Sequence, residues 1–163
     1  MPSKTMTLDE QIRMLQKFGN PEFMHKCAIG LALVCGAMLA LAYYKQEFFF
    51  LLLALMFGLF GFANRKIARN AIWAAKAWRV GFSTSGTVEM TLKTYDESTT
   101  YSGLVRDAQH KTWGMKFGKP PGWVPQAGTV AAKLYYVTEA QWPVLIVTEQ
   151  GILVPGREPK LIH

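Results

Sequence analysis

The stretch CAIGLALVCGAMLALAYYKQEFFFLLLALMFGLFGFA, residues 27–63, decides the fold of this chain, because it is apolar except for the Lys-Gln-Glu triplet at residues 45–47. The first tract, residues 27–44, carries no charge and would rise about 27 Å as a helix, close to the thickness of a bilayer core. The second tract, residues 48–63, is shorter, and the aliphatic stems of the basic side chains after it extend it toward the headgroups. The sequence therefore predicts two membrane-spanning helices joined by a tight loop.

The basic residues gather on the outer flanks of these spans. Residues 1–79 hold ten Lys and Arg against four Asp and Glu, a net of +6, whereas residues 80–163 hold eight against seven, a net of +1. Nucleic-acid binding needs basic residues concentrated on one face, so the nearly neutral C-terminal part argues against a nucleic-acid partner. By the positive-inside rule, we expect both termini in the cytoplasm, and we assign the chain to the bacterial inner membrane as an integral membrane protein.

Membrane lipid is the first partner that the sequence predicts. Three basic residues follow the second span directly, and cations this close to a bilayer attract anionic headgroups. The residues that we expect to contact headgroups are Arg65, Lys66 and Arg69.

A short amphipathic helix is predicted before the first span. Residues 7–10 read Thr-Leu-Asp-Glu, the pattern of a capping box, and apolar residues recur behind it at helical spacing. This helix would lie on the membrane surface or against a partner protein, and the sequence leaves both alternatives open.

Small residues repeat every four positions along both spans. Residues of this size let helix backbones approach closely, so their faces either pack the hairpin on itself or contact another membrane subunit. The residues concerned are Ala32, Gly36 and Ala40 in the first span, and Ala54 and Gly58 in the second. Neither span contains the ionisable residues that usually mark ion or substrate paths, so we do not expect a transporter.

The hydrophobic period changes after Gly86. Short segments rich in β-branched and aromatic residues follow, separated by turn residues, and they predict a small antiparallel β barrel or sandwich of the SH3-like or OB-like kind. The predicted strands are 87–95, 99–106, 112–117, 129–137, 143–148 and 152–155. The expected fold is thus an α+β membrane protein with an amphipathic helix (1–20), a transmembrane helical hairpin with a cytoplasmic extension (21–79) and a soluble β domain (80–163).

An aromatic loop is the candidate partner-binding site of the β domain. Its aromatic and basic side chains surround a Pro-Pro turn, a mixture typical of anchors at protein interfaces, although such aromatics equally often close a small core. The predicted partner-binding residues are Trp113, Lys116, Phe117, Lys119 and Trp123.

Catalytic and metal-binding patterns are missing from the sequence. The histidines, His25, His110 and His163, have no zinc-site spacing, and neither a nucleophile elbow nor a phosphate-binding glycine loop is present. Asp107 fits a turn residue between strands. We therefore expect no enzyme activity, no cofactor and no metal.

The expected function is that of a non-catalytic accessory subunit, assembly factor or scaffold. The absence of catalytic patterns, the small-residue helix faces and the aromatic loop together favour binding to a larger membrane protein complex or to further copies of the same chain. The alternative is a membrane-anchored regulatory domain that senses a small ligand or a peptide.

Overall fold

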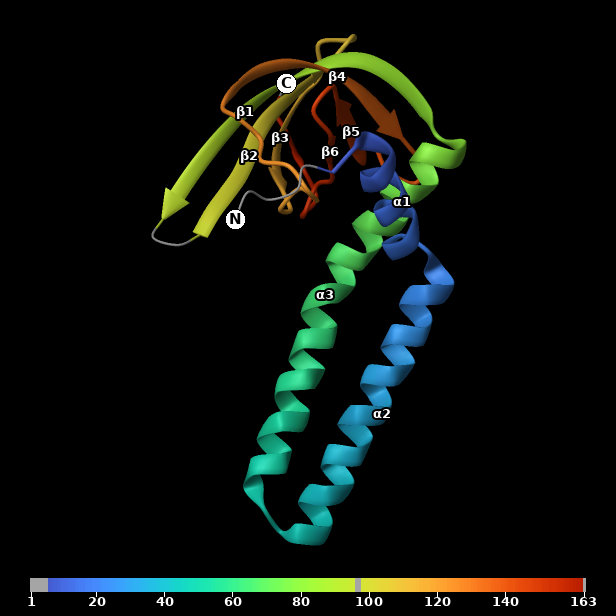
Figure 1. The fold of residues 1–163 in the computed structure, drawn as a ribbon, viewed down its shortest axis with the longest axis vertical. Helices are drawn as coiled ribbons and strands as arrows, with labels where there is room; N and C mark the ends of the chain where they lie inside the picture. Colours follow the sequence, from blue (N-terminus) through green and yellow to red (C-terminus); the bar gives the residue numbers. More distant parts are fainter. Residues whose placement is uncertain (1–5, 96–97, 163) are drawn as a thin grey trace.

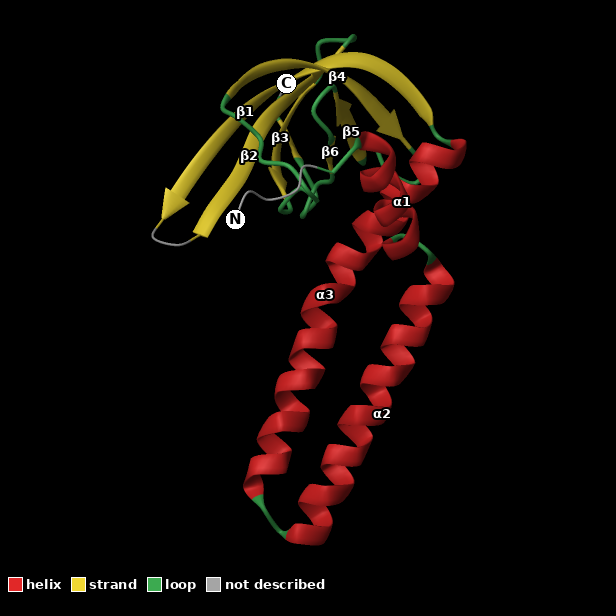
Figure 2. Cartoon of the chain, viewed as in Figure 1, coloured by secondary structure: helices red, strands yellow, loops and turns green. Residues whose placement is uncertain are grey.

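The computed structural model describes residues 6–95 and 98–162, with the side chains of residues 63–67, 95 and 98 excepted. Helices come first in the chain and strands follow, which confirms the α+β class (Figures 1 and 2). The helices are α1 (Leu8–Phe18), α2 (Pro21–Lys45) and α3 (Phe48–Val80). The strands are β1 (Phe82–Tyr95), β2 (Ser98–Asp107), β3 (Thr112–Phe117), β4 (Gly128–Tyr136), β5 (Leu145–Thr148), β6 (Ile152–Leu153) and β7 (Lys160–Leu161).

Local capping signals set where α1 and α2 begin. The Thr7 hydroxyl accepts a hydrogen bond from the Glu10 backbone N–H at 3.3 Å, and the Glu10 carboxylate accepts one from the Thr7 N–H at 2.8 Å, which confirms the capping box. The Asn20 side chain then accepts from the N–H of Glu22, with Pro21 in the first turn of α2.

Helices α2 and α3 run antiparallel, side by side, and extend away from the sheet (Figure 1). The turn between them is made by Gln46, whose φ of 56° ends α2 in the left-handed region. Within the described residues, α2 is one helix whose length and composition suit a membrane span, whereas the apolar part of α3, Phe48–Phe62, is shorter. By length and apolar composition, the structure thus supports the first of the two predicted spans, α2.

The strands form one curled, antiparallel sheet in the order β6-β5-β4-β1-β2-β3-β7. Strand β1 lies at its centre, where Gly86 pairs with Asp107 of β2 on one side and with Ala132 of β4 on the other. An isolated bridge from Phe117 to Pro155 brings the end of β3 against the segment after β6. The predicted small β barrel is therefore present as a half-barrel.

Three clusters of buried apolar side chains are found in the described residues, and the two larger ones lie on the sheet. One fills the inside of the curled sheet and contains Val88, Val105, Leu134, Ile146 and Leu153. The other lies between helices and sheet, and it contains Ile12, Leu15, Ala74, Ala75, Leu145 and Ile152.

The second core corrects the prediction for α1. We expected this helix on the membrane surface or on a partner protein, but Ile12 and Leu15 are buried against α3 and the β5–β6 pair of the same chain. Burial of apolar side chains within the chain stabilises the fold without any partner, so the apolar stripe of α1 finds its contact there.

Buried amide side chains join the helices to the segment around β6. The Gln11 Oε1 accepts from the backbone N–H of Ile152 at 3.0 Å, and the Asn70 Nδ2 donates to the carbonyl of Pro155 at 2.8 Å. Both amides are buried. A buried backbone N–H or carbonyl group without a hydrogen-bond partner destabilises the fold. These two hydrogen bonds therefore hold α1 and α3 at fixed positions on the sheet.

Candidate functional site

The contact between α2 and α3 uses part of the predicted small-residue face. The thiol of Cys35 lies 3.8 Å from the carbonyl oxygen of Ala54, and Ala54 is buried. A Cβ atom added at Gly61 would come within 2.6 Å of the Leu31 side chain. Ala54 therefore lies in the contact between α2 and α3. Of the two predicted alternatives, packing within the hairpin and contact with another subunit, the first applies to this residue.

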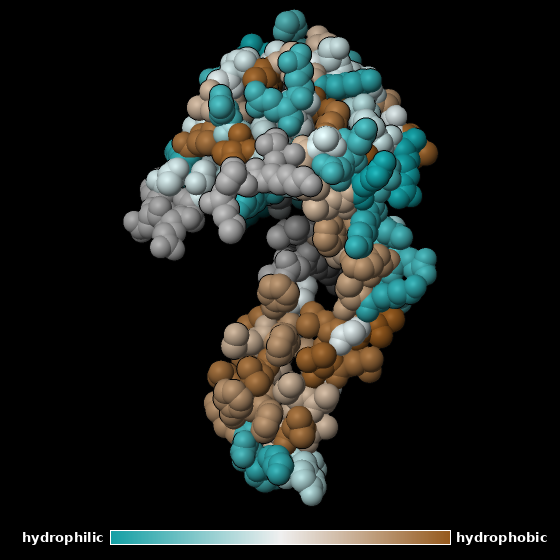
Figure 3. Space-filling model, viewed as in Figure 1, coloured by the Kyte–Doolittle hydropathy of each residue, from teal (hydrophilic) through white to brown (hydrophobic). Residues whose placement is uncertain are grey.

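The remaining small residues lie on outward faces of the helices. A Cβ atom added at Gly36 or at Gly58 would meet no atom within 4 Å, and Ala32 and Ala40 are exposed. No residue of α2 is buried. Large apolar side chains accompany them, and the space-filling view shows an almost continuous apolar surface over the part of the helix pair nearest the turn, with hydrophilic residues at the turn itself (Figure 3). These faces have no partner within the described chain.

The aromatic loop residues divide between core and surface. Trp113 is only 4% exposed and Phe117 is also buried, so these two aromatic side chains belong to the core, which is one of the two alternatives that the sequence left open. Alternate residues of a strand face the same side, and Trp113, Met115 and Phe117 of β3 all point into the sheet core. Lys116 lies between them on the exposed side.

The other two predicted partner-binding residues lie after β3. Trp123 is half-buried against the sheet core, and its indole N–H donates to the carbonyl of Ile152 at 3.4 Å. Lys119 is exposed and lines an apolar hollow of about 210 Å³ between α1 and the Pro120–Pro121 turn. The partner-binding role of these residues stays a prediction.

The predicted headgroup contacts are described only in part. The Arg69 guanidinium is exposed and lies 4.9 Å from the ring centre of Trp73, a cation–π distance. The side chains of Arg65 and Lys66 lie outside the described residues.

A pocket of about 350 Å³ with a mostly apolar lining opens at one end of the sheet. It lies where β1 begins and where β2 and β4 end, together with the β2–β3 turn, at the end of the molecule opposite the α2–α3 turn (Figure 1). We call it the Tyr136 pocket, and its lining includes Phe82, Thr84, Asp107, Lys111, Trp113 and Tyr136.

Two hydroxyl groups of this pocket are buried next to each other and beside the Asp107 carboxylate. They are the Tyr136 hydroxyl and the Thr84 Oγ1, and the Tyr136 side chain is 7% exposed. Burial raises the pKa of Tyr136 to about 12, together with the negative charge of Asp107 and a hydrogen bond to it, whereas a hydrogen bond with Thr84 acts in the opposite direction. The phenol is therefore neutral at physiological pH and offers both a donor and an acceptor.

The β2–β3 turn fixes the carboxylate of Asp107. Its Oδ1 accepts hydrogen bonds from the backbone N–H groups of Gln109 and Lys111, both at 2.9 Å. Asp107 is thus the turn residue that the sequence predicts, and it also lines the Tyr136 pocket.

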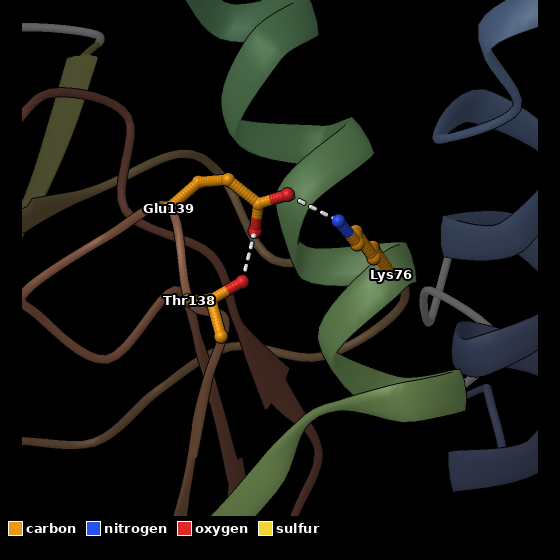
Figure 4. A network of polar contacts seen from close by, with 3 residues as sticks. All are labelled: Lys76, Thr138 and Glu139. Carbon is orange, nitrogen blue, oxygen red and sulfur yellow. Dashed lines mark hydrogen bonds and ion pairs between the residues drawn. The ribbon is translucent and has the colours of Figure 1, made fainter.

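One wall of the pocket is tied to α3. Ala140 and Gln141 of the loop after β4 line the pocket, and Glu139 just before them forms an ion pair with Lys76 of α3 and a hydrogen bond with the Thr138 hydroxyl (Figure 4). The hydrogen bond from Lys76 is the main cause that lowers the pKa of Glu139. The pocket wall and α3 are therefore connected directly.

Sequence reasoning missed the Tyr136 pocket because its side chains come from separate strands. Phe82 pairs with Tyr136 across β1 and β4, although the two residues are far apart in the chain. One signal was present in the sequence: a tyrosine at an inward position of a strand carries a hydroxyl that needs a partner. Among the described residues, no cluster of three or more His, Cys, Asp or Glu side chains suits a metal ion.

Comparison with known proteins gave no relative. No protein-family model matches the chain, and neither a curated protein nor a solved structure shows significant similarity to it.

Proposed function

We propose that this protein is a non-catalytic accessory subunit or scaffold of a larger membrane protein complex. In this proposal, α2 and α3 form a transmembrane hairpin and the half-barrel lies in the cytoplasm. The observation that carries the proposal is the outward face of α2, where small residues repeat without any partner among the described residues.

The outward face of α2 suits a neighbouring helix better than it suits lipid alone. Ala32, Gly36 and Ala40 leave a shallow strip along the helix, and a second helix can approach such a strip closely enough for extensive van der Waals contact. Gly36 has open space where a side chain would be, so nothing in the described part of the chain fills the strip at this position.

The membrane anchoring of the second helix also belongs to this proposal. The apolar part of α3, Phe48–Phe62, is about 22 Å long as a helix, shorter than a typical bilayer core. A short span is accommodated by local thinning of the bilayer and by flanking basic side chains that reach the headgroups.

The rigid joint between helices and sheet supports a scaffold. Gln11 and Asn70 bond to the backbone of the segment around β6, so the half-barrel has a fixed position relative to α1 and to the end of α3. A partner held by the helices in the membrane would thereby meet a defined surface of the β domain.

The experiment is native gel and mass spectrometry of gently solubilised membranes that contain the full chain. We expect comigration with a stoichiometric complex and its loss in Gly36→Leu. Gly30→Leu is the matched control, because Gly30 lies on a different face of α2 and a Cβ there also meets no atom within 4 Å. Migration of the wild-type chain as a monomer, or an unchanged complex in Gly36→Leu, would contradict the proposal.

A second candidate function is ligand sensing at the membrane, which the Tyr136 pocket favours. Its wall residues adjoin Glu139, whose ion pair with Lys76 connects the pocket to α3. A ligand that displaced the loop after β4 would break the ion pair between Glu139 and Lys76 and could thereby shift α3.

A further inference from the structure

We propose that an apolar hollow beside α1 docks on an anionic membrane surface. This α1 hollow has a volume of about 210 Å³, and its walls include Met14 and Phe18 of α1 and Lys119 and Pro121 of the segment after β3. The inference rests on the membrane placement of α2 in the proposed function. It goes beyond the scaffold role, because it gives the half-barrel a lipid contact of its own.

Helix α1 keeps an apolar row at the surface of the folded chain. Ile12 and Leu15 are buried against α3 and the sheet, whereas Met14 and Phe18 are 36% and 50% exposed. Met14 and Phe18 are four residues apart, so they lie on one face of the helix. The α1 hollow therefore has an apolar rim that stays exposed in the described part of the chain.

The apolar rim continues into the helix that we place in the membrane. The Phe18 ring meets the Phe23 ring edge-on, with the ring centres 6.2 Å apart, and Phe23 lies in the first turn of α2. Figure 1 shows α1 at the junction where the helix pair meets the sheet. The α1 hollow and the start of α2 therefore present one connected apolar surface.

The length of α2 sets the level of this surface in a bilayer. Its 25 residues are about 38 Å long as a helix, and a bilayer with both headgroup layers is about 40–45 Å thick. With Lys45 at the far surface, Pro21 lies among the headgroups of the near surface. Phe18 ends α1 shortly before Pro21, so the rim of the α1 hollow lies at the headgroup level as well.

Basic side chains surround the rim. Lys119 lines the α1 hollow and is exposed, and Lys17 is exposed directly beside Phe18 in the chain. Arg13, one helical turn before Lys17, is exposed too. Basic groups next to exposed apolar side chains are typical of surfaces that bind anionic lipid, since the phosphates attract the cations while the apolar groups enter the interface.

The carboxylates of this region do not oppose such a contact. Among the described residues, no acidic side chain lines the α1 hollow. Asp9 and Glu10 lie in the first turn of α1, at the end away from Phe18. Glu22, at the start of α2, forms an ion pair with Lys26 at 2.9 Å, so its charge is balanced locally. The charge at the rim is therefore complementary to an anionic membrane surface.

Spin-label accessibility of the full chain in lipid nanodiscs tests this inference. The nitroxide is attached at Gly118→Cys, in a chain whose two native cysteines are replaced by alanine. Gly118 lines the α1 hollow, and a Cβ atom there meets no atom within 4 Å. We expect access of a neutral nickel chelate to be about threefold lower in phosphatidylglycerol than in phosphatidylcholine nanodiscs. A label at Gln109→Cys, on the exposed β2–β3 turn, should show equal access in both lipids.

Charge variants at exposed positions identify the cause of the difference. Lys17→Gln combined with Lys119→Gln should raise the access at position 118 in phosphatidylglycerol to the value in phosphatidylcholine. Lys111→Gln combined with Lys160→Gln removes the same charge from exposed positions outside the α1 hollow and should leave the difference intact. Thermal unfolding checks that all variants are folded. Equal access at position 118 in the two lipids, or a difference that persists without Lys17 and Lys119, would overturn the inference.

A label on α2 separates this inference from the membrane placement on which it rests. Leu33 is 70% exposed on α2, so a nitroxide at Leu33→Cys should be accessible to oxygen and shielded from the nickel chelate in both lipids. Access of the chelate to this position would contradict the membrane placement of α2. A shielded Leu33 label with an unchanged Gly118 label would contradict only the docking of the α1 hollow.

Discussion

Gln11 and Ile152 are 141 positions apart in the chain, and the Gln11 side-chain oxygen accepts a hydrogen bond from the Ile152 backbone N–H at 3.0 Å. The same amide donates through its Nε2 to the carbonyl of Met6 at 3.1 Å. One buried side chain therefore joins the segment before α1 to strand β6. Gly151 belongs to this joint, because its φ of 157° favours glycine and a Cβ there would overlap the Trp123 indole and the Gln11 amide oxygen.

Removing the Gln11 amide should destabilise this joint. Gln11→Ala leaves a buried N–H at Ile152 without its partner, which costs about 1–3 kcal/mol of unfolding free energy. Gln16→Ala is the control, since Gln16 also lies on α1 but is only half-buried. Denaturant unfolding measures the difference, and hydrogen exchange at the Ile152 amide locates it. Equal stability of the two variants would show that this hydrogen bond does not hold α1 on the sheet.

Trp113 should prove to be a structural residue. Its ring lies in the sheet core against Tyr136, so Trp113→Ala removes a large buried side chain and should cost about 3–5 kcal/mol. Lys116→Ala changes an exposed residue on the same strand and should alter stability little. Thermal unfolding followed by near-ultraviolet circular dichroism distinguishes the two. A Trp113→Ala domain as stable as the wild type would restore the tryptophan as a candidate partner anchor.

Tyr136 should titrate later than an ordinary tyrosine. Its pKa is raised from 10.0 to about 12, so the unfolded chain loses this proton first as the pH rises. The contribution of Tyr136 to stability is fully present below pH 10 and is lost as the pH rises toward 12. Subtracting the ultraviolet titration of Tyr136→Phe from that of the wild type isolates this group.

The variant Asp107→Asn provides the control for that titration. Removing the negative charge should lower the pKa of Tyr136, although burial, the larger cause, remains. A difference curve with its midpoint near pH 10 in the wild type would mean that the phenol is not buried as described.

The sequence predicted well those helix starts and strands that depend on neighbouring residues. The capping box of α1 and the positions of β2 and β3 follow from residues within a few places of each other, and the structure confirms them. Strand β1 begins at Phe82 rather than at residue 87, because Phe82 pairs with Tyr136 of β4, a partner that is distant in sequence. The two-residue strand β7 was missed, since Lys160 and Leu161 carry too short a pattern to be recognised.

The sequence by itself determined the caps, the apolar length of α2 and the change of period that separates helices from strands. These depend on dihedral preferences, hydrogen bonds and spacings within one segment. Only the tertiary structure decided which faces are buried. It placed α1 on β6 through Gln11, turned Trp113 into the core, and brought Thr84, Asp107 and Tyr136 to one pocket. The physical reason is that burial and pairing across a sheet join residues far apart in the chain, and a periodic pattern identifies an apolar face without naming its contact.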